Sequence, residues 1–144
     1  MIAIDTNILL RYLLNDDPKQ SKLAINLING SDRVLITDVV IAEAIWTLKG
    51  KKYQLDKEGV INVISMLFAE PNICFEDGQT VWKALNDYKS AKSVKISGKS
   101  KTADFPDALI VNKAHHASKL LGESCEGLYT FDVAALKLPG TKKP

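Results

Sequence analysis

Four short apolar runs, separated by longer stretches with helical patterning, constrain the fold of this chain most strongly. The runs read MIAI, RVLIT, NICF and GLYTF, and they cover residues 1–4, 33–37, 72–75 and 127–131. Apolar runs of this length are typical of buried strands, and strands that alternate with helices indicate a parallel sheet covered on both faces. The sequence therefore predicts an α/β fold, a three-layer α/β/α sandwich built on a short parallel sheet.

The size and charge of the chain favour one globular domain. The chain has 144 residues, with 19 Lys and Arg against 17 Asp and Glu and a net charge of +2. This balance is too even for bulk charge alone to indicate a nucleic-acid-binding protein. Cys74 and Cys125 lack the spacing of a metal site or a disulfide framework, so we expect reduced thiols. The sequence shows neither a membrane-spanning run nor a cleavable leader, and a cytoplasmic protein is expected.

Several acidic residues are explained by helix capping. Asp17 precedes a proline at the first helical position, and Gln20 is placed to close a capping box. Asp56 and Asp77 also stand directly before helical patterns, as capping residues do. The segment after the last of these helices becomes rich in Ser, Gly and Lys, and it is predicted to be a basic loop at about residues 90–103.

Two acids within apolar segments are not explained in this way. Asp5 follows the run 1–4 directly, so it is expected at the carboxyl end of a buried strand. Glu43 lies too deep in its predicted helix for a capping box and shares an apolar face with Val39 and Trp46. An ionised carboxylate buried there is costly unless it is paired or bound to a metal. Glu43 is therefore either half of a buried salt bridge or a functional carboxylate, and we favour the second interpretation.

Three further acids lie near predicted element ends. Asp104 and Asp107 fit a capping box, which accounts for Asp104 as well as a functional role does, whereas Asp107 faces the interior of the fold. Asp132 follows the run 127–131 and either caps a short helix or occupies a strand end, as Asp5 does. Ligands of open α/β sheets bind in the crevice outside such strand ends.

A cluster of these carboxylates would imply a bound cation. Like charges within a few ångströms cannot all stay ionised unaided. Oxygen ligands without nearby His or Cys select Mg²⁺ or Mn²⁺, and a phosphate group is the natural partner of such an ion. The candidate ligands are Asp5, Glu43, Asp107 and Asp132.

Four segments in order resemble one known family. IDTNILLRYL, VVIAEAIWTL, DFPDALIV and YTFD together resemble the PIN-domain ribonucleases, and most closely the VapC-type toxins of toxin–antitoxin pairs. The similarity extends from Ile4 to about Gly140. It implies a single PIN domain over residues 1–144, with the basic loop at about 90–103 and a short tail at 139–144.

The resemblance also assigns roles to individual residues. The four acids of the family fall on the four candidate ligands above. Asp104 is a position where many members also carry an acid. It would either share the role of the third acid, Asp107, or contact the metal through water. In such proteins Thr6, Asn7 and Thr130 support the acidic site by hydrogen bonds. A homodimer, and inhibition by a cognate antitoxin protein, are implied as well.

The expected activity is metal-dependent hydrolysis of RNA. One or two Mg²⁺ or Mn²⁺ ions would lower the pKa of a bound water and neutralise charge that develops during hydrolysis, leaving a 5′-phosphate and a 3′-hydroxyl. Cations flanking the acids would attract the RNA, and the candidates are Arg11, Lys92, Lys95, Lys99 and Lys101. The lysine segment is equally compatible with a mobile solvated loop.

Other side chains are predicted to be structural. Tyr12 and Trp46 could stack on bases, but their apolar helical positions favour core packing. His115 and His116 are adjacent on a predicted helix and therefore point in different directions, so a metal pair is not expected.

Two alternative functions remain open. A catalytically silent PIN fold would be a binding module for nucleic acid or protein, although a lost acid would be its mark and all four positions are filled. A receiver-like or phosphatase-like protein would phosphorylate a strand-end aspartate beside Mg²⁺. That reading is disfavoured because Asn7 stands where a DxDxT phosphatase carries its second acid.

Overall fold

The computed structural model describes residues 1–144 and divides them into two compact units. The N-terminal unit comprises Met1–Gly78 and the C-terminal unit comprises Gln79–Pro144. None of the helices in the chain combines the length and the apolar character that a membrane crossing requires.

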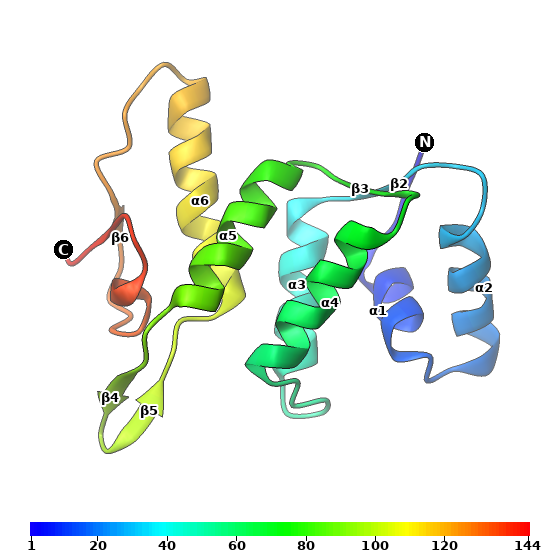
Figure 1. The fold of residues 1–144 in the computed structure, drawn as a ribbon, viewed down its shortest axis with the longest axis horizontal. Helices are drawn as coiled ribbons and strands as arrows, with labels where there is room; N and C mark the ends of the chain where they lie inside the picture. The colour runs from blue at the N-terminus through cyan, green and yellow to red at the C-terminus, as the bar shows by residue number, and fades with distance from the viewer. The chain divides into compact units, whose positions relative to one another are not determined.

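The N-terminal unit carries a three-stranded parallel sheet and four helices (Figure 1). In chain order its elements are β1 (Ile2–Ala3), α1 (Thr6–Leu14), α2 (Pro18–Ile28), β2 (Val34–Ile36), α3 (Asp38–Lys49), α4 (Lys57–Ala69) and β3 (Ile73–Phe75). The strand order is β1-β2-β3, and Val34 of the central strand pairs with Ile2 on one side and Ile73 on the other. The strands predicted at 1–4, 33–37 and 72–75 are thereby confirmed.

Helices α3 and α4 of this unit each bury one apolar stripe. In α3 the buried residues are Ile41, Ala44, Ile45 and Leu48, which recur at the spacing of a single helical face. Capping fixes where the helices begin: Asp17 accepts hydrogen bonds from the backbone of α2, and Asp56 accepts one from Gly59 N at 2.8 Å. These two predicted caps are present.

The C-terminal unit combines two long helices with short strands. Its elements are α5 (Gly78–Ser90, which begins on the last residue of the N-terminal unit), β4 (Val94–Ile96), β5 (Lys99–Lys101), α6 (Phe105–Leu120), β6 (Leu128–Tyr129), the 3₁₀ helix η1 (Ala135–Lys137) and β7 (Thr141–Lys142). Helices α5 and α6 are joined by the edge-to-face contact of Tyr88 with Phe105, whose ring centroids lie 6.2 Å apart. Asn112 Nδ2 also donates to Asp87 Oδ2 at 2.7 Å. These contacts connect the two helices of the unit.

The fourth predicted strand forms, but its partner differs from the expectation. Leu128–Tyr129 pairs in parallel with Thr141–Lys142, in a two-stranded sheet of its own. Leu128 N donates to Gly140 O at 2.8 Å and Thr130 N donates to Lys142 O at 3.0 Å. The predicted tail at 139–144 therefore contains a strand, because its backbone supplies the hydrogen bonds that β6 needs.

The basic loop predicted at about 90–103 contains a β-hairpin. Strands β4 and β5 are antiparallel, and they are joined by Ser97 and Gly98, whose φ angles are +51° and +78°. Two consecutive left-handed residues are the signature of a type I′ turn, which matches the twist of a hairpin. The prediction of a loop was wrong because β5 reads KSK, a polar strand without the apolar alternation that usually reveals one.

Candidate active site

Asp5 lies at the junction of β1 and α1. Ile4, the residue before it, is buried at 6% exposure, whereas Asp5 itself is exposed. Its Oδ1 accepts a hydrogen bond from Ile8 N at 2.9 Å, so Asp5 is the N-cap of α1. One expectation is corrected: the carboxylate does have a capping role, because the chain enters a helix immediately after the strand.

Glu43 is also exposed, and its helical face is not part of the core. Val39 and Trp46, which share that face, are 74% and 75% exposed. The prediction of a buried face was wrong because α3 is apolar on both sides, so hydrophobicity alone did not identify the buried one. Trp46 is accordingly not a core residue.

Thr6 joins Glu43 to the start of α1. Its Oγ1 donates to Glu43 Oε2 at 2.5 Å, across 37 residues of sequence. Thr47, one turn after Glu43, donates its hydroxyl to the Glu43 carbonyl oxygen at 2.9 Å. Sequence reasoning missed Thr47, although its i+4 spacing from Glu43 could have identified it.

These side chains line one pocket of about 370 Å³, here called the N-terminal pocket. Its residues are Asp5, Thr6, Asn7, Leu10, Glu43 and Thr47. Two carboxylates, two hydroxyls and an amide thus surround one space. The pocket offers the oxygen donors that Mg²⁺ and Mn²⁺ prefer and no soft ligand.

Asp104 and Asp107 lie at the start of α6 in the C-terminal unit. Asp104 is the N-cap, and Asp107 Oδ2 accepts the Asp104 backbone N–H at 2.9 Å, as in a capping box. Asp107 therefore has a structural role that the sequence analysis assigned mainly to Asp104. Burial raises the pKa of the Asp107 carboxyl, the Asp104 N–H opposes the rise, and the charges of Asp104 and Asp132 add to it.

Asp132 is held by several hydrogen bonds. Its Oδ1 accepts from Ala134 N at 2.8 Å and Ala135 N at 3.0 Å, in the turn that leads into η1. Its own N–H donates to Thr130 Oγ1 at 3.0 Å, and Lys101 Nζ lies 3.1 Å from its Oδ2. The Ala135 N–H and the Lys101 ammonium lower the pKa of the Asp132 carboxyl, although partial burial opposes this. Asp132 thus holds the turn before η1, but the N-cap of η1 is Ala134, so the helix-capping alternative for Asp132 is not met in its strict form.

The acids of the C-terminal unit lie close enough to influence one another electrostatically. Asp107 is the most affected because it is half-buried, and it lines a small pocket of about 190 Å³ together with Thr130. A bound cation would relieve the cost of ionising Asp107 in this setting. Within each unit, no group of three or more acidic, histidine or cysteine side chains is arranged to hold a metal ion.

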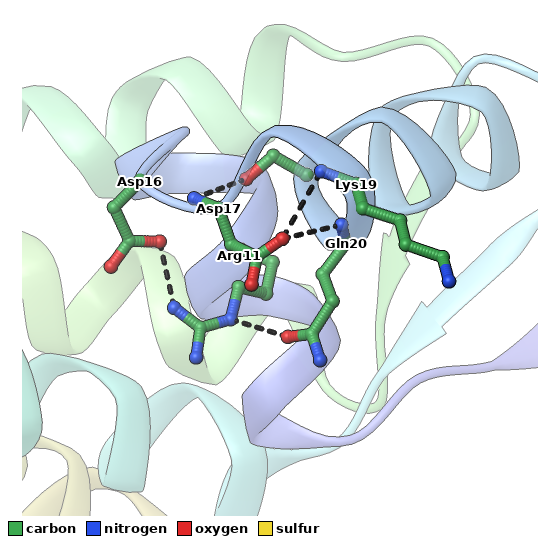
Figure 2. Close-up of polar contacts among 6 residues, drawn as sticks. Arg11, Asp16, Asp17, Lys19 and Gln20 are labelled. Atoms are coloured by element: carbon green, nitrogen blue, oxygen red, sulfur yellow. Dashed lines mark hydrogen bonds and ion pairs between the residues drawn. The ribbon is translucent and has the colours of Figure 1, made fainter.

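Arg11, one of the predicted RNA contacts, is engaged in contacts of its own. Figure 2 shows its Nη1 against Asp16 Oδ1, at 2.7 Å, and its Nε donating to Gln20 Oε1, at 2.8 Å. Gln20 therefore does not close the capping box through its side chain, although its backbone N–H donates to Asp17. Arg11 connects α1 to α2 and is less available for RNA than a solvated cation.

The hairpin distributes the predicted basic residues over two faces. Lys99 and Lys101 lie opposite Ile96 and Val94 in the ladder, so these four side chains share one face. Lys95 pairs with Ser100 and projects from the other face. Lys92 is exposed just before β4. Sequence reasoning missed that Lys101 contacts Asp132, an acid of the candidate site, because no local sequence pattern indicates that contact.

Tyr12 is partly buried, and its hydroxyl is used within the fold. It donates to Glu70 Oε1 at 3.0 Å, and burial together with this hydrogen bond raises the pKa of Tyr12 to about 12. Tyr12 is thus structural, as expected.

A comparison with known families gives one match. The model of a family described as PIN domain matches residues 2–123, which cover Asp5, Glu43, Asp104 and Asp107, whereas Asp132 lies beyond the matched range. No curated protein matches the chain.

Proposed function

This chain belongs to the PIN domain family, a nuclease-type fold, and from that premise we propose that it is a ribonuclease that hydrolyses RNA phosphodiester bonds with Mg²⁺ or Mn²⁺. The observation that carries the proposal is the N-terminal pocket. It brings Asp5 and Glu43, from elements far apart in the sequence, to one space lined otherwise by hydroxyl and amide groups. No capping role accounts for Glu43.

The carboxylates are the proposed metal ligands. Asp5 and Glu43 are the proposed ligands in the N-terminal unit, and Asp107 and Asp132 are the proposed ligands in the C-terminal unit, where Asp104 would act through water. One or two bound ions would supply an activated water at neutral pH and charge neutralisation for the leaving oxygen. The all-oxygen donor set fits a hard divalent cation.

The surrounding polar residues have orienting roles in this proposal. The Thr6 hydroxyl holds one oxygen of Glu43, which leaves its other oxygen for a ligand. The Thr130 hydroxyl holds the backbone N–H of Asp132. Asn7 lines the N-terminal pocket and can donate through its amide. The exposed lysines Lys92, Lys95 and Lys99 are the proposed contacts to the RNA backbone.

The biological setting is part of the same proposal. We propose the toxin of a toxin–antitoxin pair, of the VapC type, acting as a homodimer in the cytoplasm and inhibited by a cognate antitoxin protein. The support is the resemblance of the four acid-bearing segments, which include DFPDALIV and YTFD.

A matched pair of variants tests the catalytic claim. Asp5→Asn and Asp56→Asn each alter an exposed aspartate that caps a helix of the N-terminal unit through the backbone N–H three residues on. Asn caps a helix nearly as well as Asp, so both proteins should fold. In Asp5→Asn, RNA cleavage in Mg²⁺ or Mn²⁺ is expected to fall by about 100-fold or more, because the variant loses a proposed metal ligand. In Asp56→Asn, cleavage is expected to stay unchanged.

Two cleavage results would contradict the proposal. Cleavage that persists in a chelator, or that Asp5→Asn leaves intact, would exclude a metal held by Asp5. RNA binding without cleavage under all metal conditions would favour a binding module.

A further inference from the structure

A cavity of about 500 Å³ lies between α5 and α6 of the C-terminal unit. It is larger than the N-terminal pocket, and none of the candidate catalytic acids lines it. Its residues are Gln79, Thr80, Lys83, Asn112, His115, His116, Lys119 and Leu120.

The lining is cationic, with no acid among its residues. Lys83 and Lys119 contribute ammonium groups, and His115 and His116 contribute two imidazoles. Lys83, His115 and Lys119 take part in no ion pair. The two histidines, expected to point in different directions, line the same cavity, because positions 112, 115, 116, 119 and 120 form one stripe along α6.

Two helix ends lie at the cavity, and the end of α5 favours an anion. Gln79 and Thr80 belong to the first turn of α5, where the helix dipole presents positive partial charge. Lys119 lies in the last turn of α6 and offsets the negative end of that helix. Asp87, an acid of α5, is already engaged, since its Oδ2 accepts a hydrogen bond from Asn112 Nδ2.

The cavity is separate from the acids along α6. Asp107 lies in the first turn of α6, and His115 follows eight residues later, which corresponds to about 12 Å along a helix. An anion in the cavity would therefore lie away from the Asp107 carboxylate.

We propose that this cavity is a phosphate-binding site, built from Lys83, Lys119 and the two histidines. Ammonium and imidazole groups that line a space without an acidic side chain are suited to a phosphate group, which offers several acceptor oxygens and negative charge. The phosphate can come from a small anion or from an RNA backbone, and the chemistry of recognition is the same.

The test follows the ring signals of His115 and His116 by NMR during titration with inorganic phosphate, at low salt and in the presence of a chelator. Progressive, saturable shifts are expected in the wild-type protein. The double variant Lys83→Gln/Lys119→Gln should bind phosphate at least about tenfold more weakly. A matched variant, Lys137→Gln/Lys143→Gln, removes the same charge elsewhere in the unit and should bind like wild type.

A second arm identifies the source of the phosphate. If a short single-stranded RNA shifts the same signals and inorganic phosphate displaces it, the cavity binds backbone phosphate; if only inorganic phosphate shifts them, it binds a small anion. Absence of saturable shifts, or equal weakening in both double variants, overturns the proposal. Because chelated protein is used, failure of RNA cleavage would leave this result unaffected.

Discussion

Asp5 combines two roles at one position, because its carboxylate caps α1 and also lines the N-terminal pocket. The cap uses Oδ1 through the Ile8 N–H. Glu43 differs from it, since its side chain receives a hydrogen bond from Thr6 and caps nothing. At the scale of residues, a structural role therefore does not argue against a functional one. The sequence pointed to these acids by their chemistry but misjudged the burial of Glu43 and the capping role of Asp5.

Thr6→Val should weaken the proposed activity without unfolding the protein. The substitution keeps the shape of the side chain but removes the hydroxyl that orients Glu43. We expect RNA cleavage to fall by roughly tenfold, corresponding to a charged hydrogen bond of about 1.5 kcal/mol. Steady-state cleavage rates and thermal melting measure the two effects. Thr6→Ser retains the donor and should stay within about twofold of wild type; equal loss in both variants would contradict the role of the hydroxyl.

Asp107 gives the fold a pH dependence with a definite sign. Burial raises the pKa of its carboxyl above 3.8, so folding favours the protonated form. The protonated carboxyl therefore stabilises the fold. This contribution is complete below the pKa that Asp107 has in the unfolded chain, and it is lost as the pH rises through the higher pKa of Asp107 in the folded protein. At neutral pH the ionised carboxylate therefore opposes folding.

Asp107→Asn should accordingly melt at a higher temperature than wild type at pH 7, by roughly 1–3 °C, and at the same temperature near pH 3. The Asn oxygen can still accept the Asp104 N–H. Melting curves across this pH range, without divalent metal, provide the measurement. Asp132→Asn is a control with the opposite expected effect. The pKa of the Asp132 carboxyl is lowered in the folded protein, so the ionised carboxylate contributes stability above pH 3.8 that is lost as the pH falls. A lower melting temperature for Asp107→Asn at pH 7 would contradict this account.

At the scale of elements, the predictable parts were those with apolar patterning. β1, β2 and β3 were identified because buried strands read as continuous apolar runs. The hairpin β4–β5 and the pairing of β6 with β7 were missed, since polar strands and long-range partners leave no periodic signal. The buried face of α3 was misassigned because both of its faces are apolar.

The hairpin turn should respond to substitution in both directions. Gly98→Ala places a side chain at φ +78° and should destabilise the turn by about 1 kcal/mol. Ser97→Asn creates the Asn-Gly pair that type I′ turns prefer and should strengthen it. Cross-strand NMR contacts between Lys95 and Ser100 report on the ladder in each variant. If both variants leave those contacts unchanged, the turn assignment is wrong.

At the scale of the whole molecule, the acids selected from the sequence belong to two compact units. Asp5 and Glu43 belong to the first, whereas Asp104, Asp107 and Asp132 belong to the second. The sequence predicted one α/β domain and the family-matched range spans most of both units. Sequence patterning could identify which acids lie at element ends, but not the hydrogen bonds that Thr6, Thr130 and Lys101 make to them, because those depend on tertiary contacts.

The chemistry of the RNA ends tests the central claim most directly. Purified protein is incubated with RNA in Mg²⁺ or Mn²⁺, with a chelated sample in parallel, and the product termini are identified by mass spectrometry. Attack by an activated water predicts 5′-phosphate and 3′-hydroxyl ends that appear only with metal. Products with a 2′,3′-cyclic phosphate, or the same products in the chelated sample, would contradict metal-dependent hydrolysis.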